Sequence, residues 1–124
     1  MSVSFRGLKI WKKGFELLMK IYKVTRKFPK EERYALSDQL KRSANSVIAN
    51  IAEAHGRYHF ADKCRVLYQS RGECFETQNH LSVALGLGYL TQKEFDFLDR
   101  EYEGLGAGIN GYISSIKRLN NSVT

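Results

Sequence analysis

Lysine and arginine side chains recur through the first third of the sequence with a spacing that suits contact with phosphate groups. On a helix, where successive side chains turn by about 100°, the cations between residues 9 and 27 share an arc of about 140°. These cations are Lys9, Lys12, Lys13, Lys20, Lys23, Arg26 and Lys27. Only Glu16 interrupts the arc, whereas a solvated helix face usually mixes charges of both signs. The pattern therefore predicts sequence-independent contact with phosphates, and an ordinary solvated face is the alternative.

Further cations are positioned to extend this face in the folded chain. They are Lys30, Arg33, Lys41, Arg42, Arg57 and Arg65. The aromatic residues Trp11 and Phe15 are expected on the opposite, buried face of the same helix. Because no aromatic side chain is then interleaved with the cations, no base-stacking platform is expected. RNA or DNA should bind electrostatically, without recognition of base sequence.

Small residues form a second regular pattern near the end of the chain. The pattern consists of Gly104, Gly108, Gly111 and Ser115, at intervals of four, three and four. Each glycine should cost a free helix about 1 kcal/mol relative to alanine, so another interaction must offset the loss. The expected interaction is the close approach of a helix from a second subunit, and a kinked or frayed segment is the alternative.

Catalytic and metal-binding patterns are weak in this sequence. His55, His59 and Cys64 straddle a predicted loop with a spacing that matches no established set of zinc ligands. Asn50 and Glu53 lie near a predicted helix end, where a capping role or a polar contact is the expected function. The sequence offers no nucleophile, base and orienting group at a spacing that is typical of a catalytic site. We therefore expect no enzymatic activity, no metal and no cofactor.

Composition and charge distribution limit the class of protein. The 124 residues carry a formal charge of +7, and 43% of them are hydrophobic. The charge is polarised, because residues 1–42 hold twelve Lys/Arg and four Asp/Glu, whereas residues 73–124 hold four and seven.

No apolar run suggests a membrane span or a signal peptide, so a cytoplasmic protein is expected. Cys64 and Cys74 share a predicted helix about 15 Å apart and should remain reduced.

Four stretches with helical hydrophobic periodicity must position these residues. Their expected bounds are 8–27, 32–54, 60–86 and 92–119, within a single domain over residues 1–124. Short connections and the absence of strand patterns predict an all-α, antiparallel up-down four-helix bundle. The apolar lines expected to face the core are Leu8, Trp11, Phe15, Leu18 and Tyr22 in the first helix, Leu36, Leu40, Ala44, Val47 and Ile51 in the second, and Phe95, Leu98, Tyr102, Leu105, Ile109, Tyr112, Ile116 and Leu119 in the fourth.

The third helix is ambiguous. Arg71 and Gln78 fall on the same line as its apolar side chains. Either the core is locally polar there, or the buried face rotates toward Val66, Ser70 and Thr77. The sequence also predicts that Thr91 and Glu94 form a capping box at the start of the fourth helix.

Several stretches resemble one known family. They are Phe5 to Trp11, Phe28 to Glu32, Gln39 to Glu53, Gly56-Arg57 and Leu87 to Leu90. In these stretches the chain resembles the four-helix-bundle family named after the intervening-sequence proteins of 23S ribosomal RNA genes. The resemblance implies a ring-like homopentamer without known enzymatic activity. A similar fold occurs in the accessory variability determinant of diversity-generating retroelements, a basic pentamer that binds a reverse transcriptase and nucleic acid.

Two functional hypotheses follow from these features. The first is a non-enzymatic, oligomeric protein that binds nucleic acid or assists a nucleic-acid enzyme such as a reverse transcriptase. The second is a protein-interaction scaffold, in which the basic first third meets the acidic last helix of a neighbour or an acidic protein partner. In the second case nucleic acid would play no part.

Overall fold

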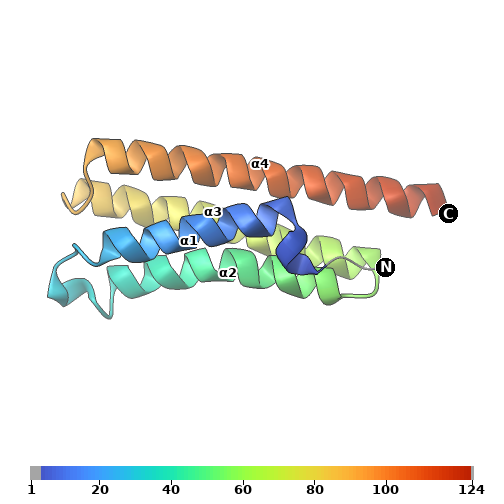
Figure 1. Cartoon of the computed structure of the whole chain (residues 1–124), viewed down its shortest axis with the longest axis horizontal. Coiled ribbons are helices and arrows are strands. Elements are labelled where there is room, and N and C mark those ends of the chain that lie inside the picture. Colours follow the sequence, from blue (N-terminus) through green and yellow to red (C-terminus); the bar gives the residue numbers. More distant parts are fainter. Residues whose placement is uncertain (1–3, 124) are drawn as a thin grey trace.

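The computed structural model describes residues 4–123, and its regular elements are four long helices and two short 3-10 turns. The helices are α1 (Lys9–Thr25), α2 (Leu36–Gly56), α3 (Phe60–Gly86) and α4 (Gln92–Val123); the 3-10 turns are η1 (Phe5–Gly7) and η2 (Lys30–Glu32). Successive helices run in opposite directions, so the predicted antiparallel up-down bundle is confirmed (Figure 1). Within the described residues, no helix is both long and apolar enough to cross a membrane.

The ends of the helices follow from local sequence. The second helix is predicted from residue 32, but Glu32 is the last residue of η2, residues 33–35 form a turn, and α2 starts only at Leu36. Gly88 adopts a φ of 80°, which favours glycine, and this turn allows the Tyr89 amide to donate to the Ala84 carbonyl at 2.9 Å. The predicted capping box is confirmed, because Thr91 Oγ1 accepts from the Glu94 amide and Glu94 Oε1 accepts from the Thr91 amide.

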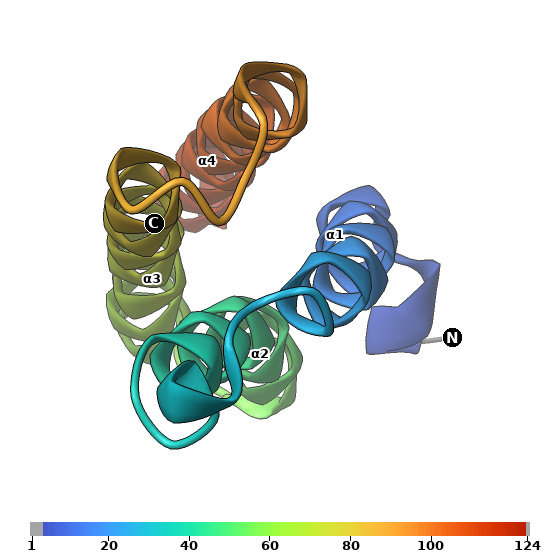
Figure 2. The ribbon, with the colours of Figure 1, turned by 90° about the vertical axis from the view of Figure 1, so that its left-hand side faces the viewer.

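The core lies between the inward faces of all four helices. The predicted line of α2, from Leu36 to Ile51, is buried throughout. The predicted line of α4 is also largely buried, with Tyr102 and Ile109 fully enclosed, although Leu119 at its end is 56% exposed. The helices follow one another around the bundle (Figure 2), and α1 and α4 share fewer contacts than the other neighbouring pairs of helices.

The structure resolves the ambiguity of α3. Both of its candidate lines are buried, because α3 packs against α2 on one side and against α4 on the other. Thr77 and Ser70 face α2, where the Thr77 hydroxyl lies 2.8 Å from that of Ser43 and Ser70 Oγ donates to the Val47 carbonyl at 2.6 Å. These bonds satisfy polar groups that would otherwise be costly to bury.

The predicted core line of α1 is wrong in part. Of its members, Leu18 is buried, but Phe15 and Tyr22 are 42% and 43% exposed. The buried side of α1 instead carries Gly14, Leu17, Leu18, Ile21, Val24 and Thr25. This helix has two adjacent apolar lines, one aliphatic and one aromatic, and the bundle buries the aliphatic one. The aromatic line is left on the surface.

Candidate nucleic-acid interface

The cations of α1 divide into two groups, and the first group faces α4. Lys13 Nζ forms an ion pair with Glu101, and Lys27 Nζ forms one with Glu94. These bonds to Lys13 and Lys27 hold the pKa of each of the two carboxyl groups below its usual value. The expectation that Lys13 and Lys27 belong to an unpaired cationic face is therefore wrong, because carboxylates of the adjacent helix neutralise them.

Lys20 lies on the same side of α1, between these two ion pairs. Its ammonium group is 5.3 Å from the centroid of the Phe97 ring of α4, a distance at which a cation is attracted to an aromatic face. A groove of about 480 Å³ lies here between the two helices. It is lined by Lys20, Lys23, Val24, Arg26, Lys27, Glu94, Phe97 and Leu98. Lys13, Lys20 and Lys27 thus attach α1 to α4.

The second group of cations is exposed to solvent, and two of its members, Lys23 and Arg26, also line the groove between α1 and α4. Lys9, Lys12 and Lys23 on α1, Arg26 at its C-cap and Lys30 in η2 are all exposed. Among the residues that the structure describes, none of these five has a carboxylate partner. Their charges therefore remain available to an external anion.

The remaining predicted cations have partners. Arg33 lies 5.3 Å from the Tyr34 ring centroid, and Lys41 lies 5.2 Å from that of Tyr22. Both keep their full charge, because an aromatic ring attracts a cation without neutralising it.

Three arginines lie beside carboxylates one helical turn away. Arg42 is 3.5 Å from Asp38, Arg65 is 3.9 Å from Asp62, and Arg57 bonds to Glu53. The Glu53 contact raises the pKa of Arg57. Glu53 therefore has the polar contact expected of it, while Asn50 is half-buried.

An exposed aromatic line borders the second group of cations. Phe15 and Tyr22 lie on it with Met19, which is 46% exposed. The Trp11 ring stacks on that of Phe15 with a centroid distance of 5.2 Å and an interplanar angle of 18°. Sequence periodicity missed this feature by assigning Phe15 and Tyr22 to the core, whereas Trp11, assigned there as well, is partly buried and does pack against it. The aliphatic spacing of Leu17, Ile21 and Val24 was the signal that could have revealed it.

The glycine pattern of α4 faces α1 at one position. A Cβ atom on Gly108 would lie 3.3 Å from Ile10 Cγ2. The lack of a side chain at Gly108 therefore allows α1 of the same chain to pack closely against α4. At Gly104 and Gly111 no atom of the described residues, apart from the local helix backbone and chain neighbours, lies within 4 Å of the equivalent position, and both glycines are exposed. Ser115 donates its hydroxyl to the Tyr112 carbonyl within α4.

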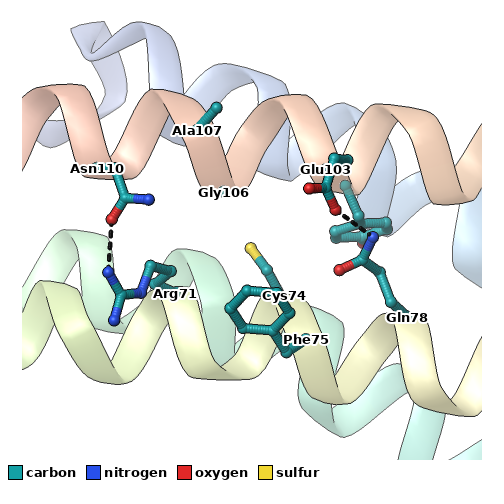
Figure 3. A pocket seen from close by; sticks show the side chains of 9 residues that line it. Arg71, Cys74, Phe75, Gln78, Glu103, Gly106, Ala107 and Asn110 are labelled. Carbon is teal, nitrogen blue, oxygen red and sulfur yellow. Dashed lines mark hydrogen bonds between the residues drawn. The ribbon is translucent and has the colours of Figure 1, made fainter.

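A small cavity of about 110 Å³ lies between α3 and α4, away from the cations of α1 (Figure 3). Hydrogen bonds from Arg71 to Asn110 (2.7 Å) and from Gln78 to Glu103 (2.9 Å) border it. Cys74 lies between these two pairs, opposite Gly106.

The chemistry of this cavity does not favour catalysis. Burial raises the pKa of Cys74 to about 12, so its thiol stays protonated at neutral pH and is a poor nucleophile. The Tyr102 hydroxyl lines the same cavity, is fully buried and has no hydrogen-bond partner, and burial raises its pKa as well. Cys64 is likewise buried, and both cysteines are free. Within residues 4–123, no group of three or more His, Cys, Asp or Glu side chains could hold a metal ion.

Comparisons with known proteins support the fold and the family. No curated protein matches the sequence at a significant level. A crystal structure of a protein of unknown function from the S23 ribosomal protein family of Bacteroides thetaiotaomicron superposes with a TM-score of 0.78 and 22% identity. The match covers 84% of this chain and 97% of that one, and at this identity it shows a shared fold. The model of the 23S rRNA-intervening sequence protein family matches residues 6–111. The chain therefore belongs to the 23S rRNA-intervening sequence protein family.

Proposed function

We propose that this protein is a non-enzymatic, basic four-helix bundle that binds RNA or DNA through contacts with phosphate groups. The observation that carries the proposal is a set of five exposed cations that have neither a carboxylate nor an aromatic partner among the described residues: Lys9, Lys12 and Lys23 on α1, Arg26 at its C-cap and Lys30 in η2. Cations that neutralise phosphates release bound counterions, which favours binding to any polynucleotide at low salt. The paired residues Lys13 and Lys27 are not part of this surface.

The non-enzymatic part of the proposal rests on the groups that the bundle places together. The cavity between α3 and α4 is lined by a protonated thiol and a buried phenol, neither of which is activated by a neighbouring base. Neither the family description nor that of the structural relative names a catalytic activity.

The proposal is tested by removing charge from two different surfaces of the same protein. One variant changes Lys12, Lys23 and Arg26 to glutamine, and the matched control changes the exposed α4 cations Lys93, Arg100 and Arg118 to glutamine. The two variants have the same net charge. Binding of labelled RNA and DNA is measured by fluorescence anisotropy at several salt concentrations.

The α1 variant should bind at least about tenfold more weakly, and its logarithmic salt dependence should become shallower by about 2 to 3. The α4 variant should retain most of the affinity and the slope. Equal losses in the two variants would show that net charge alone governs binding, and the proposed surface would then be wrong. Absence of binding by the unmodified protein at low salt would refute the function itself.

A second candidate function is a protein-interaction scaffold, which the exposed side chains Phe15, Met19 and Tyr22 favour. Aromatic residues and methionine are enriched in protein interfaces, and exposed apolar patches often mark such sites. The family resemblance adds a homo-oligomer, with a pentamer as the expected form and the open glycines of α4 as the expected contact.

The oligomer is tested at Gly104, where an added Cβ atom would have no atom of the described residues within 4 Å beyond the local helix backbone. Gly104→Leu should lower the mass measured by light scattering if a second subunit packs there. Gly72→Leu is the matched control, because Gly72 is also an exposed glycine within a helix and has open space around it. An unchanged mass for Gly104→Leu would exclude this contact. Gly108 is unsuitable, since its substitution would disturb Ile10 of the same chain.

The expected protein partner, a reverse transcriptase or another nucleic-acid enzyme, rests on the family resemblance alone. A direct test is co-purification of a tagged bundle with an enzyme encoded beside it. The Lys12, Lys23 and Arg26 variant then distinguishes attachment through shared nucleic acid from direct protein contact, because only the former should be lost.

A further inference from the structure

The outward side of α1 combines exposed aromatic residues with unpaired cations. Phe15 and Tyr22 are 42% and 43% exposed, and neither ring is fully covered by its neighbours. Phe15 stacks with Trp11 at 5.2 Å, and Lys41 lies 5.2 Å from the centroid of the Tyr22 ring. Each ring therefore has a defined position while retaining surface that a ligand can contact.

These rings lie close to the cations around the helix axis. At about 100° per residue, Lys12, Phe15, Met19, Tyr22, Lys23 and Arg26 fall within an arc of about 100°. At a rise of about 1.5 Å per residue, they extend over about 21 Å of α1. The surface is thus a narrow strip in which the apolar side chains Phe15, Met19 and Tyr22 lie between Lys12 at one end and Lys23 and Arg26 at the other.

We infer that this strip binds single-stranded nucleic acid, with bases stacked on Phe15 and Tyr22 and phosphates beside Lys12, Lys23 and Arg26. The inference rests on the proposed function and names its ligand class. Proteins that bind single strands combine cationic grooves with aromatic platforms, because an unpaired base exposes a flat face that an aromatic ring can contact. In a duplex the bases are stacked on one another, so only its phosphates would be available to this strip.

Charge complementarity favours a polynucleotide over a second copy of this chain on the same strip. Two copies meeting through this surface would bring its cations of like sign together, and Glu16, the one carboxylate of α1 beside them, cannot balance the three cations of each copy. Burying these cations against an apolar protein surface would also remove them from water without a counter-charge. A single strand supplies an anion for each cation and a ring face for each aromatic residue.

The test compares single and double strands with variants that remove the rings but preserve apolar character. The double variant Phe15→Leu, Tyr22→Leu is matched by Phe75→Leu, because Phe75 is 60% exposed on α3. The probes are a labelled oligothymidylate of about 20 nucleotides and the same strand paired with oligoadenylate. Circular dichroism confirms that each variant is folded, and light scattering gives its mass.

The unmodified protein should bind the single strand more tightly than the duplex. The double variant should lose at least about fivefold in single-strand affinity, with little change for the duplex, while Phe75→Leu should alter neither. Trp11 is the sole tryptophan and stacks on Phe15, so its fluorescence should change on single-strand binding and much less on duplex binding.

Two results would overturn the inference of single-strand binding but would leave the proposed binding to phosphate groups intact. One is equal, salt-dependent binding of single strand and duplex by all variants, which would leave phosphate contact as the whole interaction. The other is a lower mass of the double variant with unchanged affinity, which would assign the strip to contact between subunits. Failure of the unmodified protein to bind either probe at low salt would refute both proposals.

Discussion

Replacing Gly14 with alanine tests how closely α1 and α2 approach one another. Gly14 is buried, and a Cβ atom added there would overlap Cγ2 of Ile48 in α2, whose own Cβ would be only 3.9 Å away. Ile48 is a β-branched residue that is 7% exposed, so its methyl group cannot swing aside freely. The added methyl must therefore shift a helix or distort the Ile48 side chain.

The expected magnitude is a balance of two opposing effects. Overpacking of a core by one methyl group costs about 1 to 3 kcal/mol. Alanine is favoured over glycine within a helix by about 1 kcal/mol. Gly14→Ala should therefore lower the free energy of unfolding by as much as about 2 kcal/mol. Gly72→Ala, a control with no atom near its added Cβ, should raise the free energy of unfolding by about 1 kcal/mol.

Urea denaturation followed by circular dichroism measures both variants, and the difference between them isolates the steric effect. Ile48→Ala should cost about 2 to 5 kcal/mol alone but less in the presence of Gly14→Ala, because the added methyl occupies part of the space that Ile48 leaves. The reasoning would be refuted if Gly14→Ala stabilised the protein as much as Gly72→Ala does. It would also be refuted if the two substitutions at Gly14 and Ile48 were additive.

Two further changes probe polar groups between α2 and α3. Burial and a hydrogen bond with Glu76 raise the pKa of Glu73 to about 7, so the folded protein holds a proton there that the unfolded chain loses near pH 4.5. The stability that this protonated carboxyl group contributes is present at low pH and is lost as the pH rises through about 7. In Glu73→Gln the midpoint of urea unfolding should therefore change less with pH between about pH 5 and pH 8. A pH profile like that of the unmodified protein would contradict the raised pKa of Glu73. Thr77→Val removes the bond between Thr77 and Ser43 and should cost about 1 to 2 kcal/mol in the same assay, whereas a neutral effect would mean that the bond contributes nothing.

The α2 and α4 faces could be predicted from the sequence because each carries one dominant apolar line. In α2 the line from Leu36 to Ile51 is buried as expected, and in α4 the line through Tyr102 and Ile109 is buried as well. A single line leaves only one way to turn the helix inward, so periodicity alone determines its orientation.

The orientation of α1 could not be predicted in the same way. Its aromatic line through Phe15 and its aliphatic line through Leu17 are both compatible with a helix in a bundle. Gly14 decides between them, because its lack of a side chain lets α1 approach Ile48 with the aliphatic line inward. That contact joins residues far apart in the sequence, and no local pattern reveals it.

The sequence places the cations of residues 9–27 together on one side of a helix, but it does not define which of them form ion pairs. Periodicity places Lys13, Lys27 and Lys23 on a common side of α1, yet only the packing of α4 brings Glu101 and Glu94 to the first two. Ion pairs between helices depend on their rotation and offset, which the sequence of either helix does not define. The cations that remain unpaired consequently had to be identified from the structure.

The salt dependence of polynucleotide binding by the unmodified protein is the most direct test of its proposed function. Four or five phosphate contacts by the five unpaired cations predict a logarithmic slope between about −3 and −3.5 for a single strand, since each contact contributes about −0.7. Anisotropy titrations with oligothymidylate across a range of salt concentrations give this slope. A slope near zero, or no binding at the lowest salt concentration, would contradict a function based on phosphate contact.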